Sequence, residues 1–121
     1  MLITFADDAG TVYVDLELAS IRTFAYDRDV WTRTHDFSTS PESGLITDGV
    51  LSPDEVGKVY ALAAAIGSRQ GRSHPNELHG FGMQRLAISD KVTISDSVWN
   101  EGELDDPDII RCAGYMRALR R

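Results

Sequence analysis

Nucleophilic catalysis in this chain would use Cys112 or a serine together with His35, His74 or His79 as the base. A weak nucleophile needs a neighbouring base to activate it, and no local signature of serine or cysteine catalysis surrounds these residues. Cys112 falls instead on the apolar stripe of an expected helix, where a cysteine packs as a small hydrophobe. We therefore expect no catalytic residue in this set.

A loop that carries two of the histidines is the candidate for metal or ligand binding. His74 and His79 lie five positions apart, with Glu77 between them, in a segment flanked by Gly and Pro. This spacing matches no standard zinc pattern, and histidines in loops are ordinarily solvated, so we expect no metal and no cofactor. Titratable groups on a segment longer than a simple connection still support an alternative function. This alternative is a small enzyme, or a metal- or ligand-binding domain, that uses the 68–82 loop.

A pair of carboxylates is the remaining route to general acid–base chemistry. Asp15 and Glu17 are two positions apart, which places both on one face of a strand. They could act together only if that face lined a cleft. The same alternation describes the solvated face of an antiparallel sheet, which is the interpretation we favour.

Acidic side chains are dense near the C-terminal end of the chain. Five carboxylates occur within the eight residues from Glu101 to Asp108, which is more than a helix N-terminus requires. Aromatic anchors beside steering charges are typical of protein-binding surfaces, and a tryptophan accompanies this cluster and an earlier acidic turn. The predicted partner-binding residues are Trp99, Glu101, Glu103, Asp105, Asp106, Asp108, Asp27, Asp29 and Trp31. Alternatively, Trp99 ends a strand in the core and the acids form a solvated loop.

The charge balance restricts the partners. Twelve Lys and Arg against nineteen Asp and Glu give a net charge of −7, which opposes direct binding to nucleic acid or to anionic membranes. A basic protein partner fits this charge better, although acidic excess also serves solubility alone. The single cysteine excludes an internal disulfide, and neither a secretory signal nor a run of ~18 apolar residues is present. We expect a cytoplasmic protein.

The first half of the chain has the alternation of an antiparallel sheet. Leu2–Ala6 and Thr11–Ala19 flank an Asp-Asp-Ala-Gly turn, and the second stretch carries Val or Leu at every other position from 12 to 18. Ile21–Tyr26 and Val30–Phe37 are two further β-prone stretches. Ser38–Gly49 is rich in Ser, Thr and Gly, and we expect a loop there.

Two helix starts and a second hairpin make up the rest of the chain. Ser52, a proline after it and Glu55 form the pattern of an N-cap with a capping box. Met83–Ile88 and Val92–Trp99 predict a hairpin, and Asp105–Asp108 places acids at the positive end of a second helix dipole. The apolar stripe of that helix is formed by Ile109, Cys112, Ala113, Met116 and Leu119.

These elements predict one α+β domain over residues 1–121. It has an antiparallel β-sheet of about five to six strands with two helices packed on one face, in the order β-β-β-β-α-β-β-α. Because the chain lacks catalytic signatures and is acidic, we expect a non-enzymatic protein-binding module of bacterial type. It is of the immunity or inhibitor kind and neutralises a basic or nucleic-acid-directed partner protein.

Overall fold

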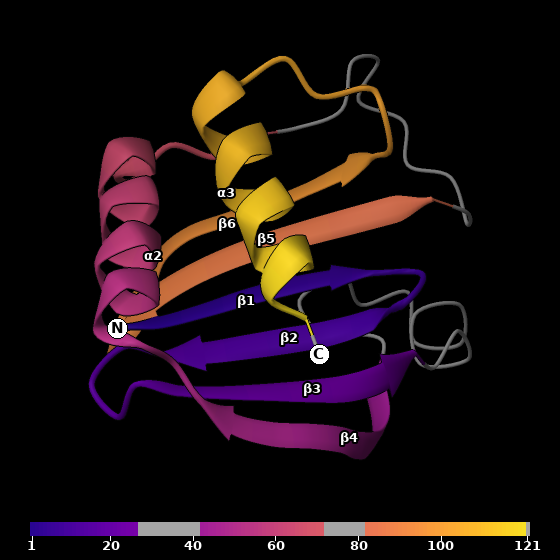
Figure 1. Ribbon diagram of the computed structural model, residues 1–121. Helices are drawn as coiled ribbons and strands as arrows, with labels where there is room; N and C mark the ends of the chain where they lie inside the picture. Colours follow the sequence, from indigo (N-terminus) through magenta and orange to yellow (C-terminus); the bar gives the residue numbers. More distant parts are fainter. Residues whose placement is uncertain (27–41, 72–81, 121) are drawn as a thin grey trace.

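The computed structural model describes residues 1–26, 42–71 and 82–120. Its elements are β1 (Leu2–Asp7), β2 (Gly10–Asp15), β3 (Ser20–Tyr26), β4 (Glu42–Val50), α2 (Pro53–Ile66), β5 (Met83–Asp90), β6 (Val92–Asn100) and α3 (Pro107–Leu119). The strands form one antiparallel sheet in the order β4-β3-β2-β1-β5-β6, and both helices lie on the same face of it (Figure 1). The expected α+β fold and element order are confirmed.

The register of the strands brings the alternating apolar residues onto the face that the helices cover. Ile3 of β1 lies opposite Val14 of β2, and Val14 lies opposite Ile21 of β3. On the other side of β1, Ile3 lies opposite Ile88 of β5. β1 is therefore a central strand, and it joins the N-terminal strands to the β5–β6 hairpin.

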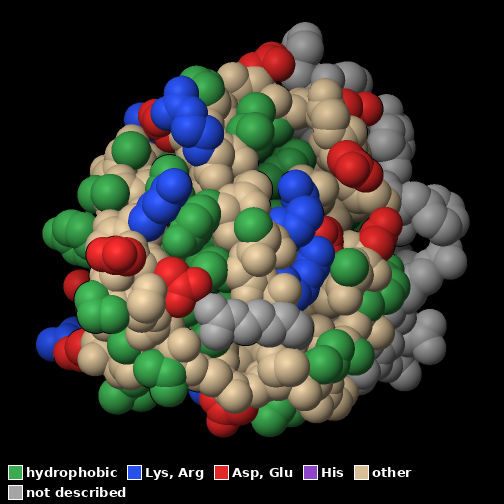
Figure 2. Space-filling view, viewed as in Figure 1, with side chains coloured by type: hydrophobic (Ala, Val, Ile, Leu, Met, Phe, Trp, Pro, Cys, Tyr) green, Lys and Arg blue, Asp and Glu red, His purple; other side chains and the backbone are tan. Residues whose placement is uncertain are grey.

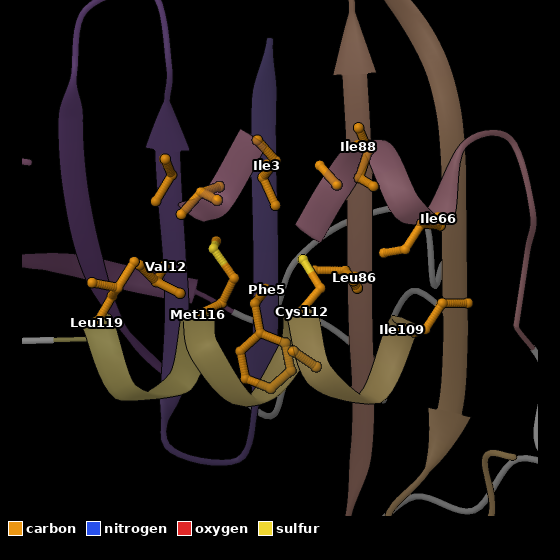
Figure 3. Packing of buried hydrophobic residues seen from close by; sticks show 14 of the residues in the cluster. Ile3, Phe5, Val12, Ile66, Leu86, Ile88, Ile109, Cys112, Met116 and Leu119 are labelled. Carbon is orange, nitrogen blue, oxygen red and sulfur yellow. The ribbon is translucent and has the colours of Figure 1, made fainter. Parts of the chain in front are cut away.

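The hydrophobic core lies between this face and the two helices. From α3, Ile109, Cys112 and Met116 point toward the sheet, where the ring of Phe5 packs beside them (Figure 3). Ile66 contributes from α2. The stripe predicted for the second helix is buried along its whole length. Burying apolar surface contributes about 25 cal/mol of free energy per Å2, and this gain holds the helix on the sheet.

Both helices begin at the residues that the sequence indicates. The Glu55 amide donates to Ser52 Oγ at 3.1 Å, and the Ser52 amide donates to Glu55 Oε1 at 2.8 Å, which completes the capping box. Asp106 caps α3, because its Oδ1 accepts from the amides of Asp108 and Ile109. These bonds satisfy backbone donors that have no partner inside a helix.

The strand expected over Thr11–Ala19 is shorter than predicted and ends at Asp15. Its side chain explains the early end, since Asp15 Oδ1 accepts from the amides of Glu17 and Leu18 and so closes a turn. Leu18, expected on the buried face, is exposed in this turn. The hydrogen bonds from the backbone amides to Asp15 therefore end the strand, although the alternation of apolar residues continues beyond it.

The loop expected over Ser38–Gly49 is wrong for its second half, where β4 lies. β4 pairs with β3 through two irregularities, one between Thr23 and Phe24 and one between Phe24 and Tyr26. Extra residues at such irregularities break the strict alternation of apolar and polar residues by which a strand is recognised in a sequence. β4 is therefore a strand because it pairs with β3, not because of its own pattern. The strand expected over Val30–Phe37 lies outside the described residues.

The segment that follows α2 contacts side chains on the helix-covered face of β6. Ser95 Oγ donates to the carbonyl of Arg69, and the Gly71 amide donates to Ser97 Oγ at 2.8 Å. Gly71 is buried against Leu104, and a Cβ at this position would stand 2.7 Å from Leu104 Cδ1. Neither α2 nor α3, the helices of the described ranges, is long and apolar enough to span a bilayer.

Candidate functional site

Trp99, the aromatic next to the acidic cluster, lies in the core. It is 3% exposed, and its indole Nε1 donates to Gln84 Oε1 at 2.9 Å. The alternative interpretation of Trp99, as the end of a buried strand, therefore describes its position. Its ring cannot serve as an exposed anchor for a partner, and the aromatic component of the predicted surface is absent at this position.

Two acids of the cluster are engaged by an arginine from the segment after α2. Arg69 Nε lies 3.1 Å from Asp106 Oδ2, and its terminal nitrogen lies 2.7 Å from Asp108 Oδ2. The hydrogen bond from Arg69 lowers the pKa of Asp106. The hydrogen bonds that Asp106 accepts from the amides of Asp108 and Ile109 lower it further. Asp108 also pairs with Arg111 at 3.3 Å. Two of the acids at the start of α3 therefore hold that end of the helix against the segment that follows α2.

The other three acids differ in their exposure. Glu103 Oε2 accepts from Asn100 Nδ2 at 2.8 Å and is half-buried. Glu101 and Asp105 are exposed. The Glu101 amide donates to the carbonyl of Gly82 at 2.7 Å, which fixes the backbone at the end of β6. Of the cluster, Glu101 and Asp105 are thus the acids whose side chains face solvent.

Glu101 lies at a groove between α3 and the ends of β1, β5 and β6, which we call the α3 groove. It has two adjoining hollows, of about 210 Å3 and about 330 Å3, which share Gln84, Glu101 and Arg117. The smaller hollow is also lined by Trp99, Gly102, Leu104, Ile110 and Ala113. The larger hollow is also lined by Asp7, Asp8, Ala9, Gly82, Met83 and Arg120. The residues that line only the smaller hollow are apolar or glycine, whereas those that line only the larger hollow include Asp7, Asp8 and Arg120. We call these two parts the apolar end and the charged end of the groove.

The charged end contains a paired network and two exposed carboxylates. Asp7 is held by Arg120 and, at 3.4 Å, by Arg117. Burial raises the pKa of Asp7, but the hydrogen bonds from Arg120, Ala9 and Arg117 outweigh it, so the net pKa lies below the usual value. Asp8 is exposed and accepts from the Gly82 amide at 3.2 Å.

The guanidinium groups of Arg117 and Arg120 also contact the core. They lie 5.2 Å and 5.9 Å from the centre of the Phe5 ring. This position keeps the two cations over the aromatic face, where the electron density of the ring attracts them. Figure 2 shows the helical face, where basic and acidic side chains are interspersed rather than separated into one acidic patch.

Several residues singled out from the sequence lie outside the described ranges. These are Asp27, Asp29 and Trp31 of the predicted partner surface, and His35, His74, Glu77 and His79 of the catalytic and metal hypotheses. In the described part of the chain, no group of three His, Cys, Asp or Glu side chains is placed to hold a metal ion. Cys112 is buried, and burial raises the pKa of its thiol to about 12.

Of the groove residues, sequence reasoning assigned only Trp99 and Glu101 to a site, and it missed Asp8, Gln84 and Arg117 among others. Gln84 had a usable signal, because it shares the alternation of Leu86 and Ile88 and is therefore a polar residue in a core-facing register. Asp8 and Arg117 are far apart in the chain and carry no such signal. Only the topology brings the end of β1 beside the C-terminal half of α3 (Figure 1).

Comparison of the chain with protein-family models, with curated proteins and with solved structures finds no match.

Proposed function

We propose that this protein is a non-enzymatic acidic protein-binding module of the immunity or inhibitor kind, which neutralises a basic or nucleic-acid-directed partner protein. One observation carries the proposal: two exposed carboxylates, Asp8 and Glu101, line the same groove. They come from opposite halves of the chain, so the fold has assembled them. A cationic side chain of a partner could contact both.

The apolar end of the groove supports the same kind of ligand. Ile110 is partly exposed beside the buried side chains of Leu104 and Ala113. Lys and Arg carry long apolar stems that pack on such surfaces while their charged ends reach polar groups. The hydrogen bond between Trp99 and Gln84 fixes the floor of the groove, so little conformational freedom is lost when a partner binds.

The groove also carries positive charge, which limits how the partner can bind. Arg117 is 44% exposed at its side chain and lines both hollows. Asp7 offsets part of its charge. The remaining donors of Arg117 suit a backbone carbonyl or a carboxylate of the partner, next to the cation that Asp8 and Glu101 attract. A polypeptide supplies both groups, which favours a protein partner over a simple cation.

This proposal moves the expected contact surface. Asp106 and Asp108 are paired with Arg69 and Arg111, so their contribution to long-range attraction is small. Glu101 and Asp105 remain as candidate contacts from the cluster, and Asp8 joins them. The alternative function is a small ligand or metal bound by the 68–82 loop, of which Gly82 lines the groove.

The test is capture of partners by the tagged protein from its native extract at low and at high salt, followed by binding kinetics with purified components. The variant Asp8→Asn/Glu101→Gln removes the charges of the two exposed groove carboxylates, and Glu17→Gln/Asp54→Asn is a control with the same change in net charge at exposed positions. We expect the groove variant alone to weaken binding of a basic partner, by about tenfold and mainly through slower association.

Three outcomes would count against the proposal. Equal weakening in both variants would mean that only net charge matters, and no weakening in either would remove the groove from the interface. Stoichiometric metal or a small ligand in protein purified without chelators, with no protein partner, would favour the 68–82 loop instead.

A further inference from the structure

Gly82 contacts both of the residues whose exposed carboxylates line the α3 groove. Its amide donates to Asp8 Oδ2 at 3.2 Å, and its carbonyl accepts from the Glu101 amide at 2.7 Å. The β1–β2 turn, the start of β5 and the end of β6 lie at the same end of the sheet, which brings the three residues together (Figure 1). One residue therefore ties together the two segments that carry these acids.

The backbone of Gly82 has a conformation that restricts the residue type. Its φ is 65°, in the left-handed region, where a Cβ comes too close to the following carbonyl oxygen. Asparagine tolerates this region better than other residues that have a side chain. The backbone alone therefore explains why position 82 would hold glycine or asparagine, but it does not separate these two residues.

The missing side chain of Gly82 leaves space next to the carboxylate of Glu101. A Cβ at position 82 would stand 3.6 Å from Glu101 Cβ and 3.7 Å from Glu101 Oε2, which are ordinary van der Waals distances. A side chain would thus fit there, but it would occupy space beside the oxygen that a hydrogen-bond donor of a ligand needs. Glycine keeps this space open and allows a ligand to approach the backbone closely.

The charges around this space leave an excess of carboxylate. The larger hollow is lined by three carboxylates and two guanidinium groups, those of Asp7, Asp8, Glu101, Arg117 and Arg120. Asp7 pairs with both arginines. Among the described residues, no Lys or Arg pairs with Asp8 or Glu101. The hollow therefore has a net negative charge, which a single cationic group would neutralise.

We propose that the Gly82 site, the space beside Gly82 and next to Asp8 and Glu101, binds the cationic group of a lysine or arginine side chain of the partner. Gly82 is then a specificity-determining residue of the α3 groove. The cationic group donates to the two carboxylates, and its apolar stem lies toward Leu104 and Ile110 at the apolar end. This inference rests on the proposed function, from which it takes the protein partner.

A small cationic probe tests the Gly82 site on the intact protein. The probe is acetyl-arginine methylamide, and the matched control is acetyl-citrulline methylamide, which has the shape of the arginine side chain without its charge. We expect the arginine probe to shift the amide NMR signals of Gly82 and Glu101 up to saturation, and added salt to weaken this binding. The citrulline probe should shift neither signal.

Two asparagine substitutions provide the second part of the test. Gly82→Asn fills the Gly82 site without a change in charge. Gly67→Asn makes the same change at the C-terminal end of α2, where φ is 60°, a Cβ would meet no atom within 4 Å, and helices end with glycine or, less often, asparagine. Both variants should fold, which urea unfolding checks. We expect Gly82→Asn to weaken binding of the arginine probe by about tenfold and Gly67→Asn by less than twofold.

Three results would overturn the inference. These are equal signal changes with the two probes, signal changes that avoid Gly82 and Glu101, and equal effects of the two substitutions on binding of the arginine probe.

Binding kinetics with a purified partner separate this inference from the proposed function. Because Gly82→Asn leaves every charge in place, it should speed dissociation and leave association unchanged, whereas Asp8→Asn/Glu101→Gln should slow association. Full partner binding by Gly82→Asn, with weakened binding by Asp8→Asn/Glu101→Gln, would remove this inference and leave the proposed function intact. Full binding by both variants would remove the α3 groove from the interface, and the proposed function would fail with it.

Discussion

Asp7 offers the sharpest test of the forces that hold the α3 groove together. Its carboxylate and the guanidinium of Arg120 are both nearly buried, with a second contact at 3.0 Å between Arg120 Nη2 and Asp7 Oδ2. Arg117 adds a contact at 3.4 Å, and the Ala9 amide donates to Asp7 at 2.8 Å. The substitution Asp7→Asn keeps the size and the bond to Ala9 but removes the charge.

The expected loss of stability follows from these contacts. A hydrogen bond to a charged group contributes about 1.5–3 kcal/mol, and removing one member of a largely buried ion pair leaves the other charge uncompensated. Arg120 keeps its bond to the carbonyl of Gly10, and solvent at the mouth of the groove screens the remaining charge. We therefore expect Asp7→Asn to lower the free energy of unfolding by about 2 kcal/mol, and Tm by about 8 °C.

The dependence of this loss on pH gives the prediction its specificity. The pKa of Asp7 is lowered in the folded protein, so its contribution to stability is fully present above the unfolded-state value of 3.8. The contribution is lost as pH falls through the folded-state pKa, because both states are then protonated. The gap between wild type and Asp7→Asn should be constant near neutral pH, shrink from about pH 4 downward and finally close.

Urea unfolding, monitored by tryptophan fluorescence, measures the free energy of unfolding of both proteins. Repeating it in steps from pH 7 down to the lowest pH at which the protein is folded gives the dependence of the loss on pH. Asp105→Asn is the control, because that carboxylate is exposed and should change stability by less than about 0.5 kcal/mol. The reasoning fails if Asp7→Asn is as stable as wild type at pH 7. It also fails if the gap keeps its full size in acid.

Two further predictions concern single sites. Burial raises the pKa of the Cys112 thiol to about 12, so at pH 8 it should react with a disulfide reagent only as fast as the protein unfolds. Rapid stoichiometric labelling of the folded protein would contradict this buried position. Gly10 has a φ of 137°, and a Cβ there would stand 2.3 Å from the Phe24 carbonyl oxygen, so Gly10→Ala should cost about 3 kcal/mol or more in urea unfolding. The helical Gly57→Ala, which meets no atom within 4 Å, is its control and should stabilise by up to about 1 kcal/mol, whereas equal effects of the two changes would refute the argument.

The parts of the fold that were predictable are those in which local chemistry and the final packing agree. The capping box at Ser52 and the proline after Asp106 need only a few neighbouring residues, and both start helices. The apolar stripe from Ile109 to Leu119 needs only the period of a helix, and it is buried. In each case the signal and the structure depend on the same short stretch.

β4 and the groove were not predictable for the opposite reason. β4 is recognised by its pairing with β3, through irregularities that leave no regular alternation in the sequence. Asp8 and Glu101 line one groove because β5 pairs with both β1 and β6, and no local pattern reports the pairing with β1. The acids of the cluster were visible, but their partner Arg69 lies in a different segment, so the sequence could not separate paired carboxylates from exposed ones.

The central position of β1 also bears on how the chain folds. β1 is synthesised before the other described strands, yet one of its two neighbours, β5, pairs with it through contacts as distant as Ile3 with Ile88. Until β5 has been synthesised, the backbone groups on that edge of β1 have no partner strand, and α3, which covers Phe5, is also missing. Late formation of such long-range strand pairs slows folding and prolongs the lifetime of intermediates that expose apolar surface and aggregate. We therefore expect the docking of the β5–β6 hairpin to be a late step in folding, and conditions that delay it to raise the yield of aggregate.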